Sequence, residues 1–382
     1  MPAHDEPETT PKIAPAARRL LGPGPSNVHP RVLNAMAQPL LGHLDPAFLE
    51  ILDGVQGSLR ELFGTKNRFT LPLSATGSAG MEACLVNLLE AGDRVVVGVN
   101  GVFGARMADV AARAGAEVTR VEAEWGLPLD EDAMVAGIQS AKPKVVAFVH
   151  AETSTGVCQS PENIARAARD AGALVVLDCV TSLAGIPVNL DRWGVDAAYS
   201  GSQKCLSCSP GLSPVSFSDR AIEAVRARAT PVQSWFMDVG LLDGYYGGER
   251  VYHHTAPISA IYGLAEGLAR VMEEGMEKRA LRHQEAAEHL LERLAPLGFT
   301  PLVAAEYRLP MLTTLELPES VVERGEARVR RDLLDRHGIE VGAGLGALAG
   351  RVWRVGLMGE NAREDAVDAL HAALEVELGP AD

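Results

Sequence analysis

Apolar and polar positions alternate along the first half of the chain with periods that switch between those of strands and helices. Strand-like runs occupy residues 94–100, 116–124, 144–150 and 173–180. Between them, residues 105–115, 130–141 and 160–172 carry apolar side chains at helical spacing, and two of these stretches end in glycine. Strands that alternate with helices of this length predict an α/β fold with a mainly parallel sheet covered by helices on both faces.

A different pattern begins at about Ser259. We interpret residues 258–298 as one long helical tract that connects to a second domain. Strand-like runs at 311–317 and 351–357 and helical runs at 324–338 and 361–378 follow, which indicates a smaller α+β domain. The expected organisation is a flexible amino-terminal arm over 1–19, a large domain over 20–258, and the connecting helix with the small domain over 259–382.

Composition and charge exclude several classes of protein. The 382 residues exceed one core of usual size, which favours two domains. A formal charge of −15 argues against a nucleic-acid backbone or an anionic membrane as partner. The sequence has no apolar run of membrane-spanning length and no signal core at its start, so we expect a cytoplasmic protein.

Five cysteines, an odd number in a long chain, do not indicate a disulfide framework. Cys205 and Cys208 form a lone CxxC pattern without a second ligand pair at matching spacing. We therefore expect no metal site and interpret these two cysteines as packing residues.

Polar residues gather where the apolar runs end. They lie where the runs at 94–100, 144–150 and 173–180 end, at Asn100, His150–Ser154 and Asp178. A further apolar run over 195–199 ends at Ser200–Lys204. Because ligands of parallel sheets bind at the carboxyl ends of the strands, these residues are expected to converge on one rim of the sheet.

Three features of this rim carry candidate chemistry. Lys204 is a lone cation among small residues, either a surface lysine or an enclosed amine that attacks a carbonyl. Asp178 either caps a turn or pairs with a buried cation. The small residues 75–80 lead into a helix and suit a phosphate, although an empty turn would carry the same residues. Together they are the parts that pyridoxal 5′-phosphate needs.

At this point the sequence resembles a known family. The blocks "LLGPGPSNVHPRVLNAM", "ETSTGV", "LVVLDCV", "YSGSQKC", "YHHTAPISAIYGL" and "VWRVGLMG" resemble the class V aminotransferases, in particular the alanine–glyoxylate and serine–glyoxylate or serine–pyruvate branch. The resemblance runs in the same order from about Leu20 to the carboxyl end. It implies the fold type I of pyridoxal-phosphate-dependent transferases, whose large domain holds a sheet of the seven-stranded type.

The resemblance also implies roles for residues around the cofactor. Lys204 would hold it through a Schiff base, and Asp178 would pair with the pyridine nitrogen. Val180 would lie beneath the ring, and Phe103 would stack on it where many relatives have Trp. Thr153 would reach the ring hydroxyl, in place of a Ser common in relatives.

Phosphate and substrate contacts follow from the same resemblance. The phosphate would be bound by Thr76, Gly77, Ser78 and Gln203, with Tyr252 and Thr255 supplied by the neighbouring subunit of a homodimer. Arg354 would bind the substrate carboxylate, with Gly24 and Gly42 also in the substrate site.

The implied activity is transfer of an amino group from alanine or serine to glyoxylate or pyruvate by a ping-pong mechanism. Alternatives are related transaminases that use aspartate–glyoxylate or pyridoxamine–pyruvate. A cysteine desulfurase-type lyase would need a reactive cysteine on a mobile loop and usually a His before the lysine, where this chain has Gln203. A non-catalytic relative of the fold would lack the combination of Lys204, Asp178 and Arg354.

Overall fold

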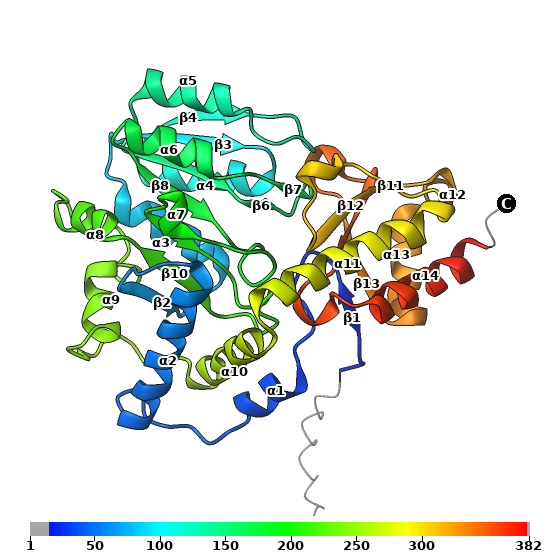
Figure 1. The fold of residues 1–382 in the computed structure, drawn as a ribbon, viewed down its shortest axis with the longest axis horizontal. Helices are drawn as coiled ribbons and strands as arrows, with labels where there is room; N and C mark the ends of the chain where they lie inside the picture. The colour runs from blue at the N-terminus through cyan, green and yellow to red at the C-terminus, as the bar shows by residue number, and fades with distance from the viewer. Residues whose placement is uncertain (1–14, 380–382) are drawn as a thin grey trace, which may run out of the picture.

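A seven-stranded sheet forms the centre of the larger part of the molecule (Figure 1). The computed structural model describes residues 15–379, so most of the expected arm over 1–19 lies outside the described residues. β10 runs antiparallel to both of its neighbours, and the other neighbouring pairs are parallel, which confirms the predicted mainly parallel sheet. In spatial order the strands are β2 (Phe69–Leu73), β10 (Ser213–Phe217), β9 (Ala197–Tyr199), β8 (Leu174–Asp178), β5 (Val145–Val149), β3 (Arg94–Val99) and β4 (Glu117–Glu122).

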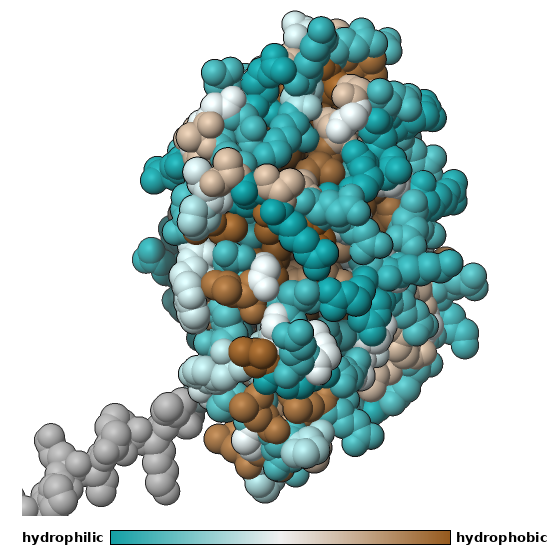
Figure 2. Space-filling view, turned by 90° about the vertical axis from the view of Figure 1, so that its left-hand side faces the viewer, coloured by the Kyte–Doolittle hydropathy of each residue, from teal (hydrophilic) through white to brown (hydrophobic). Residues whose placement is uncertain are grey.

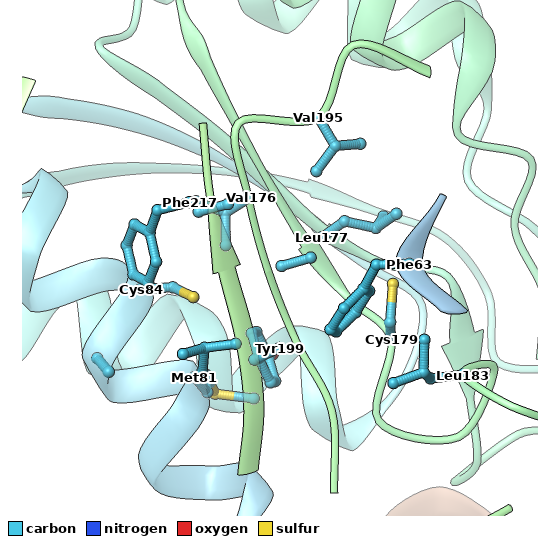
Figure 3. Close-up of a cluster of buried hydrophobic side chains, with 14 of the residues drawn as sticks. Phe63, Met81, Cys84, Val176, Leu177, Cys179, Leu183, Val195, Tyr199 and Phe217 are labelled. Atoms are coloured by element: carbon cyan, nitrogen blue, oxygen red, sulfur yellow. The ribbon is translucent and has the colours of Figure 1, made fainter. Parts of the chain in front are cut away.

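Helices cover both faces of this sheet, as its apolar strands require. They are α1 (Pro30–Met36), α2 (Pro46–Phe63), α3 (Gly77–Leu88), α4 (Val102–Arg113), α5 (Glu131–Ala141), α6 (Glu162–Asp170), α7 (Leu190–Trp193), α8 (Asp219–Arg226), α9 (Val239–Tyr246) and α10 (Ile258–Glu274). Figure 3 shows one part of the core, in which Met81 and Cys84 of α3 lie near Tyr199, and Phe63 lies near Leu177.

The strands and helices predicted between residues 94 and 180 begin and end within about three residues of those in the structure. The largest difference is at α4, which begins at Val102 instead of the expected residue 105. Its first N–H groups are bound by side chains from a hairpin, β6 (Ala151–Glu152) and β7 (Val157–Cys158). A cap supplied from so far along the chain leaves no local signal in the sequence.

The second domain packs a five-stranded sheet against helices, as the α+β prediction requires. Its spatial order is β1 (Arg19–Leu21), β13 (Ile339–Ala343), β14 (Val352–Gly356), β12 (Leu312–Glu316) and β11 (Thr300–Pro301). The helices of this part of the chain are α11 (Met276–Leu294), α12 (Glu319–Arg324), α13 (Glu326–His337) and α14 (Glu364–Leu378).

The first described strand belongs to this smaller sheet, which differs from the expected domain boundary at residue 20. β1 pairs in parallel with β13, and Leu21 is fully buried in the core of the second domain. In Figure 1 the blue amino-terminal strand accordingly lies beside the orange strands near the carboxyl end.

The single long helix expected over 258–298 is two helices. α10 ends at Glu274 and α11 begins at Met276, with Gly275 between them at φ 80° and ψ 140°. That backbone conformation is open to glycine and strained for other residues, so the continuous helical pattern of the side chains is broken by the backbone. No helix in the described range 15–379 is long and apolar enough to cross a membrane.

Candidate functional site

A cavity of ≈ 290 Å³ lies at the carboxyl ends of the strands of the large sheet. This is the rim at which the sequence predicted convergence. The residues that line the cavity are Thr76, Gly77, Ser78, Met81, Phe103, Ala151, Thr153, Asp178, Val180, Thr181, Tyr199, Gln203 and Lys204. Nine of them were expected from the sequence to bind a cofactor: Thr76, Gly77, Ser78, Phe103, Thr153, Asp178, Val180, Gln203 and Lys204. The structure therefore brings this predicted set together.

The Lys204 amine is enclosed within the site. Burial lowers the pKa of Lys204 to about 8, and the positive charge of Arg354 acts in the same direction, whereas Asp178 opposes the shift. Nζ donates a hydrogen bond to the backbone carbonyl of Pro23. Gly24, at φ 108°, passes so close that a Cβ there would lie 2.7 Å from Nζ. A side chain at position 24 would therefore displace the amine.

Asp178 ends β8 and is 2% exposed. Burial raises the pKa of its carboxyl to about 7, while hydrogen bonds from Tyr199 and Val180 oppose that rise. The Tyr199 hydroxyl donates to Oδ2 at 2.7 Å, and the Val180 N–H donates to Oδ1 at 2.8 Å. Both carboxylate oxygens are thus held in fixed directions.

The amino end of α3 forms one corner of the cavity. The Thr76 hydroxyl, at the N-cap, makes no capping hydrogen bond, so the first N–H groups of the helix are not satisfied by it. A Cβ at Gly77 would lie 3.1 Å from a Val180 methyl and 3.3 Å from the Ser200 carbonyl, so this position favours glycine. Gln203 follows on the facing loop, and its buried Oε1 has no hydrogen-bond partner among the described residues.

Phe103 and Arg354 reach this region from different elements. Phe103 lies in the first turn of α4, and the guanidinium of Arg106 sits 5.1 Å from the centre of its ring. Arg354, on β14 of the smaller sheet, is 6% exposed and donates to the carbonyls of Ala343 at 2.8 Å and Thr153 at 3.0 Å. Burial lowers the pKa of Arg354 to about 10. It contacts the cavity wall at Thr153 without lining the cavity itself.

Three of the expected binding residues lie elsewhere in this single chain. Gly42, Tyr252 and Thr255 do not line the cavity. Tyr252 is 60% exposed, and its ring centre lies 5.3 Å from that of His43, so the loops around 42 and 252 are neighbours. Thr255 is exposed as well.

Two functional candidates were missed by sequence reasoning. Tyr199 ends an apolar strand and counted only as part of an apolar run, although it lines the cavity and donates to Asp178. Its place directly before the polar residues of the rim was the available signal. Arg106 is exposed and its Nη1 lies 3.5 Å from the Ser78 hydroxyl. No local pattern pointed to Arg106, because the helix expected over 105–115 did not include Phe103, which lies one turn before it.

The cysteines beside the lysine are structural. Cys205 and Cys208 are buried, and burial raises the pKa of each thiol to about 12. Their Sγ atoms donate to the carbonyls of Thr181 at 3.2 Å and Gly263 at 3.5 Å. Thiols with such pKa values are poor nucleophiles at neutral pH. Within residues 15–379, no group of three or more His, Cys, Asp or Glu side chains is arranged to hold a metal ion.

The arrangement fits pyridoxal 5′-phosphate. Its aldehyde calls for an amine such as that of Lys204, its ring nitrogen for a carboxylate such as Asp178, and its phosphate for the unsatisfied amino end of α3. All three features face one cavity.

Comparisons with known proteins agree with this chemistry. The family model described as aminotransferase class-V matches residues 20–370. The (S)-ureidoglycine–glyoxylate transaminase of Bacillus subtilis is 37% identical, with 94% of this chain and 90% of that protein covered. An alanine–glyoxylate aminotransferase of Drosophila melanogaster is 38% identical over 94% and 91% of the two chains. The crystal structure of an alanine–glyoxylate aminotransferase from Nostoc sp. superposes with a TM-score of 0.92 at 49% identity, covering 98% of this chain and 97% of that one.

The enclosure of Lys204 predicts amine reactivity near neutral pH. We expect reductive methylation of the cofactor-free protein by formaldehyde and cyanoborohydride to label Lys204 with a half-maximal rate near pH 8, because that is where its amine loses its proton. An ordinary lysine has a pKa of about 10.4. Peptide mass spectrometry gives the rate at each lysine, with the exposed Lys142 as internal reference. The same pH profile at both residues would contradict the prediction.

Proposed function

The chain belongs to the class-V aminotransferases, which depend on pyridoxal 5′-phosphate, and on this premise we propose that it moves an amino group from alanine or serine to glyoxylate or pyruvate. The observation that carries the proposal is the placement of Lys204 and Asp178 in one cavity beside the amino end of α3, with Arg354 at its wall. Exchange of an amino group in two half-reactions would proceed by ping-pong kinetics.

Lys204 and Asp178 would handle the protons of the reaction. The bound cofactor supplies an electron sink for the bond that breaks at Cα. Because its pKa is about 8, Lys204 has an unprotonated fraction at neutral pH that can take the Cα proton and would then deliver it to the aldehyde carbon of the cofactor. Asp178, held by Tyr199 and Val180, would face the ring nitrogen and favour its protonated form.

The remaining lining residues would bind and orient. Thr76, Gly77, Ser78 and Gln203 would hold the phosphate at the amino end of α3, where the helix dipole favours an anion. Phe103 and Val180 would enclose the ring from its two faces, and Thr153 would reach its hydroxyl.

Arg354 would bind the substrate carboxylate. Its Nε and Nη1 hold the carbonyls of Ala343 and Thr153, which fixes the plane of the guanidinium and leaves Nη2 for the substrate. Gly24 would form one wall of the substrate site next to the Lys204 amine. A side chain at position 24 would clash with Lys204. A role for Gly42 in the substrate site would require the neighbouring subunit, because the cavity of this chain does not reach it.

We further propose a cytoplasmic homodimer in which Tyr252 and Thr255 complete the phosphate site of the neighbouring subunit. Their exposure in the single chain and their distance from its own cavity support this arrangement. Other large apolar side chains are exposed at Trp235, Leu241 and Val251. Figure 2 views the side of the molecule on which α8 and α9 lie, and apolar patches interrupt its polar surface.

The five cysteines are unpaired, which suits the reducing compartment proposed for this chain.

Replacement of Lys204 tests the catalytic assignment. We expect Lys204→Ala to lose both the visible absorbance of covalently bound cofactor and all measurable turnover, because Lys204 is the only lysine among the described residues that line the cavity. Lys142→Ala is the matched control and should retain both. Turnover by the Lys204→Ala protein at the rate of the wild type would refute the assignment.

Single half-reactions test the amino donor. With the cofactor-loaded enzyme, alanine or serine should convert the visible band to that of the amine form faster than aspartate does. The reason is that the described residues lining the cavity include no arginine for a second carboxylate, and Arg354 at its wall is assigned to the one carboxylate that all three donors share. Stopped-flow absorbance gives the rates. Ureidoglycine belongs in the panel, since the Bacillus relative is named for it. A fastest rate with ureidoglycine or aspartate would replace the proposed donor.

Hybrid dimers test the shared phosphate site. Lys204→Ala and the double variant Tyr252→Ala/Thr255→Ala should each be inactive or nearly so. In a one-to-one mixture half the dimers are hybrids, and each would have one intact site, so activity should return to about a quarter of the wild-type value. If the two residues served their own subunit, the hybrid would have no intact site and the mixture would stay inactive.

A further inference from the structure

Glu152 is a fully buried carboxylate that the proposed chemistry does not use. It lies on β6, next to Thr153, and its side chain is 0% exposed. Oε2 accepts the N–H groups of Phe103 at 3.1 Å and Gly104 at 3.2 Å. Oε1 accepts the N–H of Ser154 at 3.0 Å and its hydroxyl at 2.5 Å. Each of its oxygens therefore has two donors, and no cationic side chain within residues 15–379 bonds to it.

These contacts make Glu152 the cap of α4. The helix has twelve residues, and Gly101 at its N-cap has no side chain to bind the first N–H groups. Ser154 completes the cap, since its hydroxyl accepts the N–H of Val102 at 2.9 Å. An anion at this end of a helix interacts favourably with the helix dipole. Burial raises the pKa of Glu152, and the surrounding donors oppose that rise.

The space around the carboxylate is fitted to it. A Cβ at Gly101 would lie 2.5 Å from Cδ of Glu152 and 2.4 Å from the Ser154 hydroxyl oxygen. The chain between β3 and α4 can therefore approach the hairpin this closely only with glycine at 101. Because the Glu152 carboxylate binds the backbone N–H of Phe103 in the first turn of α4, it fixes the position of the Phe103 Cα atom, from which the side chain projects.

We propose that Glu152 is a positioning residue that holds the first turn of α4, and with it the Phe103 ring, against the cofactor. The inference rests on the proposed function, because it assigns Phe103 to the ring face. Glu152 is not among the residues that line the cavity, so it acts through the backbone of Phe103. It thereby joins the segment that bears Thr153 to the segment that bears Phe103, and both of these residues line the cavity.

Cofactor affinity tests this role without reference to turnover. We expect Glu152→Gln to raise the dissociation constant for pyridoxal 5′-phosphate at least tenfold, because each carboxylate oxygen accepts two donors and the amide group of Gln must oppose one of these pairs in either orientation, which weakens the hold on the first turn of α4. The visible circular dichroism of the bound cofactor should fall as the ring loses its fixed contact. Glu117→Gln, at an exposed strand position, is the control. An unchanged dissociation constant and dichroism for Glu152→Gln would overturn the proposal.

A double-mutant cycle separates positioning from general stability. If Glu152 acts through Phe103, the Phe103→Leu/Glu152→Gln double variant should bind the cofactor about as weakly as Phe103→Leu alone. Losses that multiply would overturn the proposal. If Glu152→Gln does not fold, Ser154→Ala gives a second cycle with Phe103→Leu, because it removes the hydroxyl that binds Glu152 Oε1 and the Val102 N–H. Its loss of cofactor affinity should likewise vanish in the Phe103→Leu background, and losses that multiply would again overturn the proposal.

The wild-type protein distinguishes the two levels of inference. If it binds pyridoxal 5′-phosphate and transaminates while the cycle is additive, the role of Glu152 is wrong and the proposed function stands. A wild-type protein that neither binds the cofactor nor transaminates refutes the proposed function, and the role of Glu152 with it.

Discussion

Exclusion of water from the sheet rim is the constraint on which the chemistry of this molecule depends. The same burial lowers the pKa of Lys204 and raises that of Asp178, since both groups lose the solvation of their charged forms. Hydrogen bonds from Tyr199 and Val180 keep the carboxyl oriented despite that cost. The parallel sheet makes such a buried site possible, because its strands end together at one rim and bring distant parts of the chain to one place.

Local patterns predicted much of the fold. The alternation of strand and helix between residues 94 and 180 was enough to predict the parallel sheet, because each element carries its own period of apolar residues. What local patterns could not show were effects of the backbone and of distant partners. Gly275 breaks a tract whose side chains remain helical in spacing, and α4 starts early because Glu152 and Ser154 cap it.

Part of the candidate site could also be predicted from local patterns in the sequence. Asp178 and Lys204 stood out because polar residues end apolar runs, and the phosphate corner stood out as a small-residue entry to a helix. Tyr199 did not stand out, since an aromatic residue at the end of an apolar strand is usually core, and Figure 3 shows it packed among core side chains. The reach of Arg354 across the two sheets depends on tertiary structure, and only the family resemblance pointed to it.

The pairing of β1 with β13 means that the smaller sheet is not a continuous piece of the sequence. A fragment that began at residue 259 would lack Leu21 in its core and would expose the backbone edge of β13 to pairing with other chains. The segment that leaves β1 then passes directly over the Lys204 amine at Pro23 and Gly24. Separate expression of the two halves would therefore remove an edge strand from one product and uncover the lysine in the other.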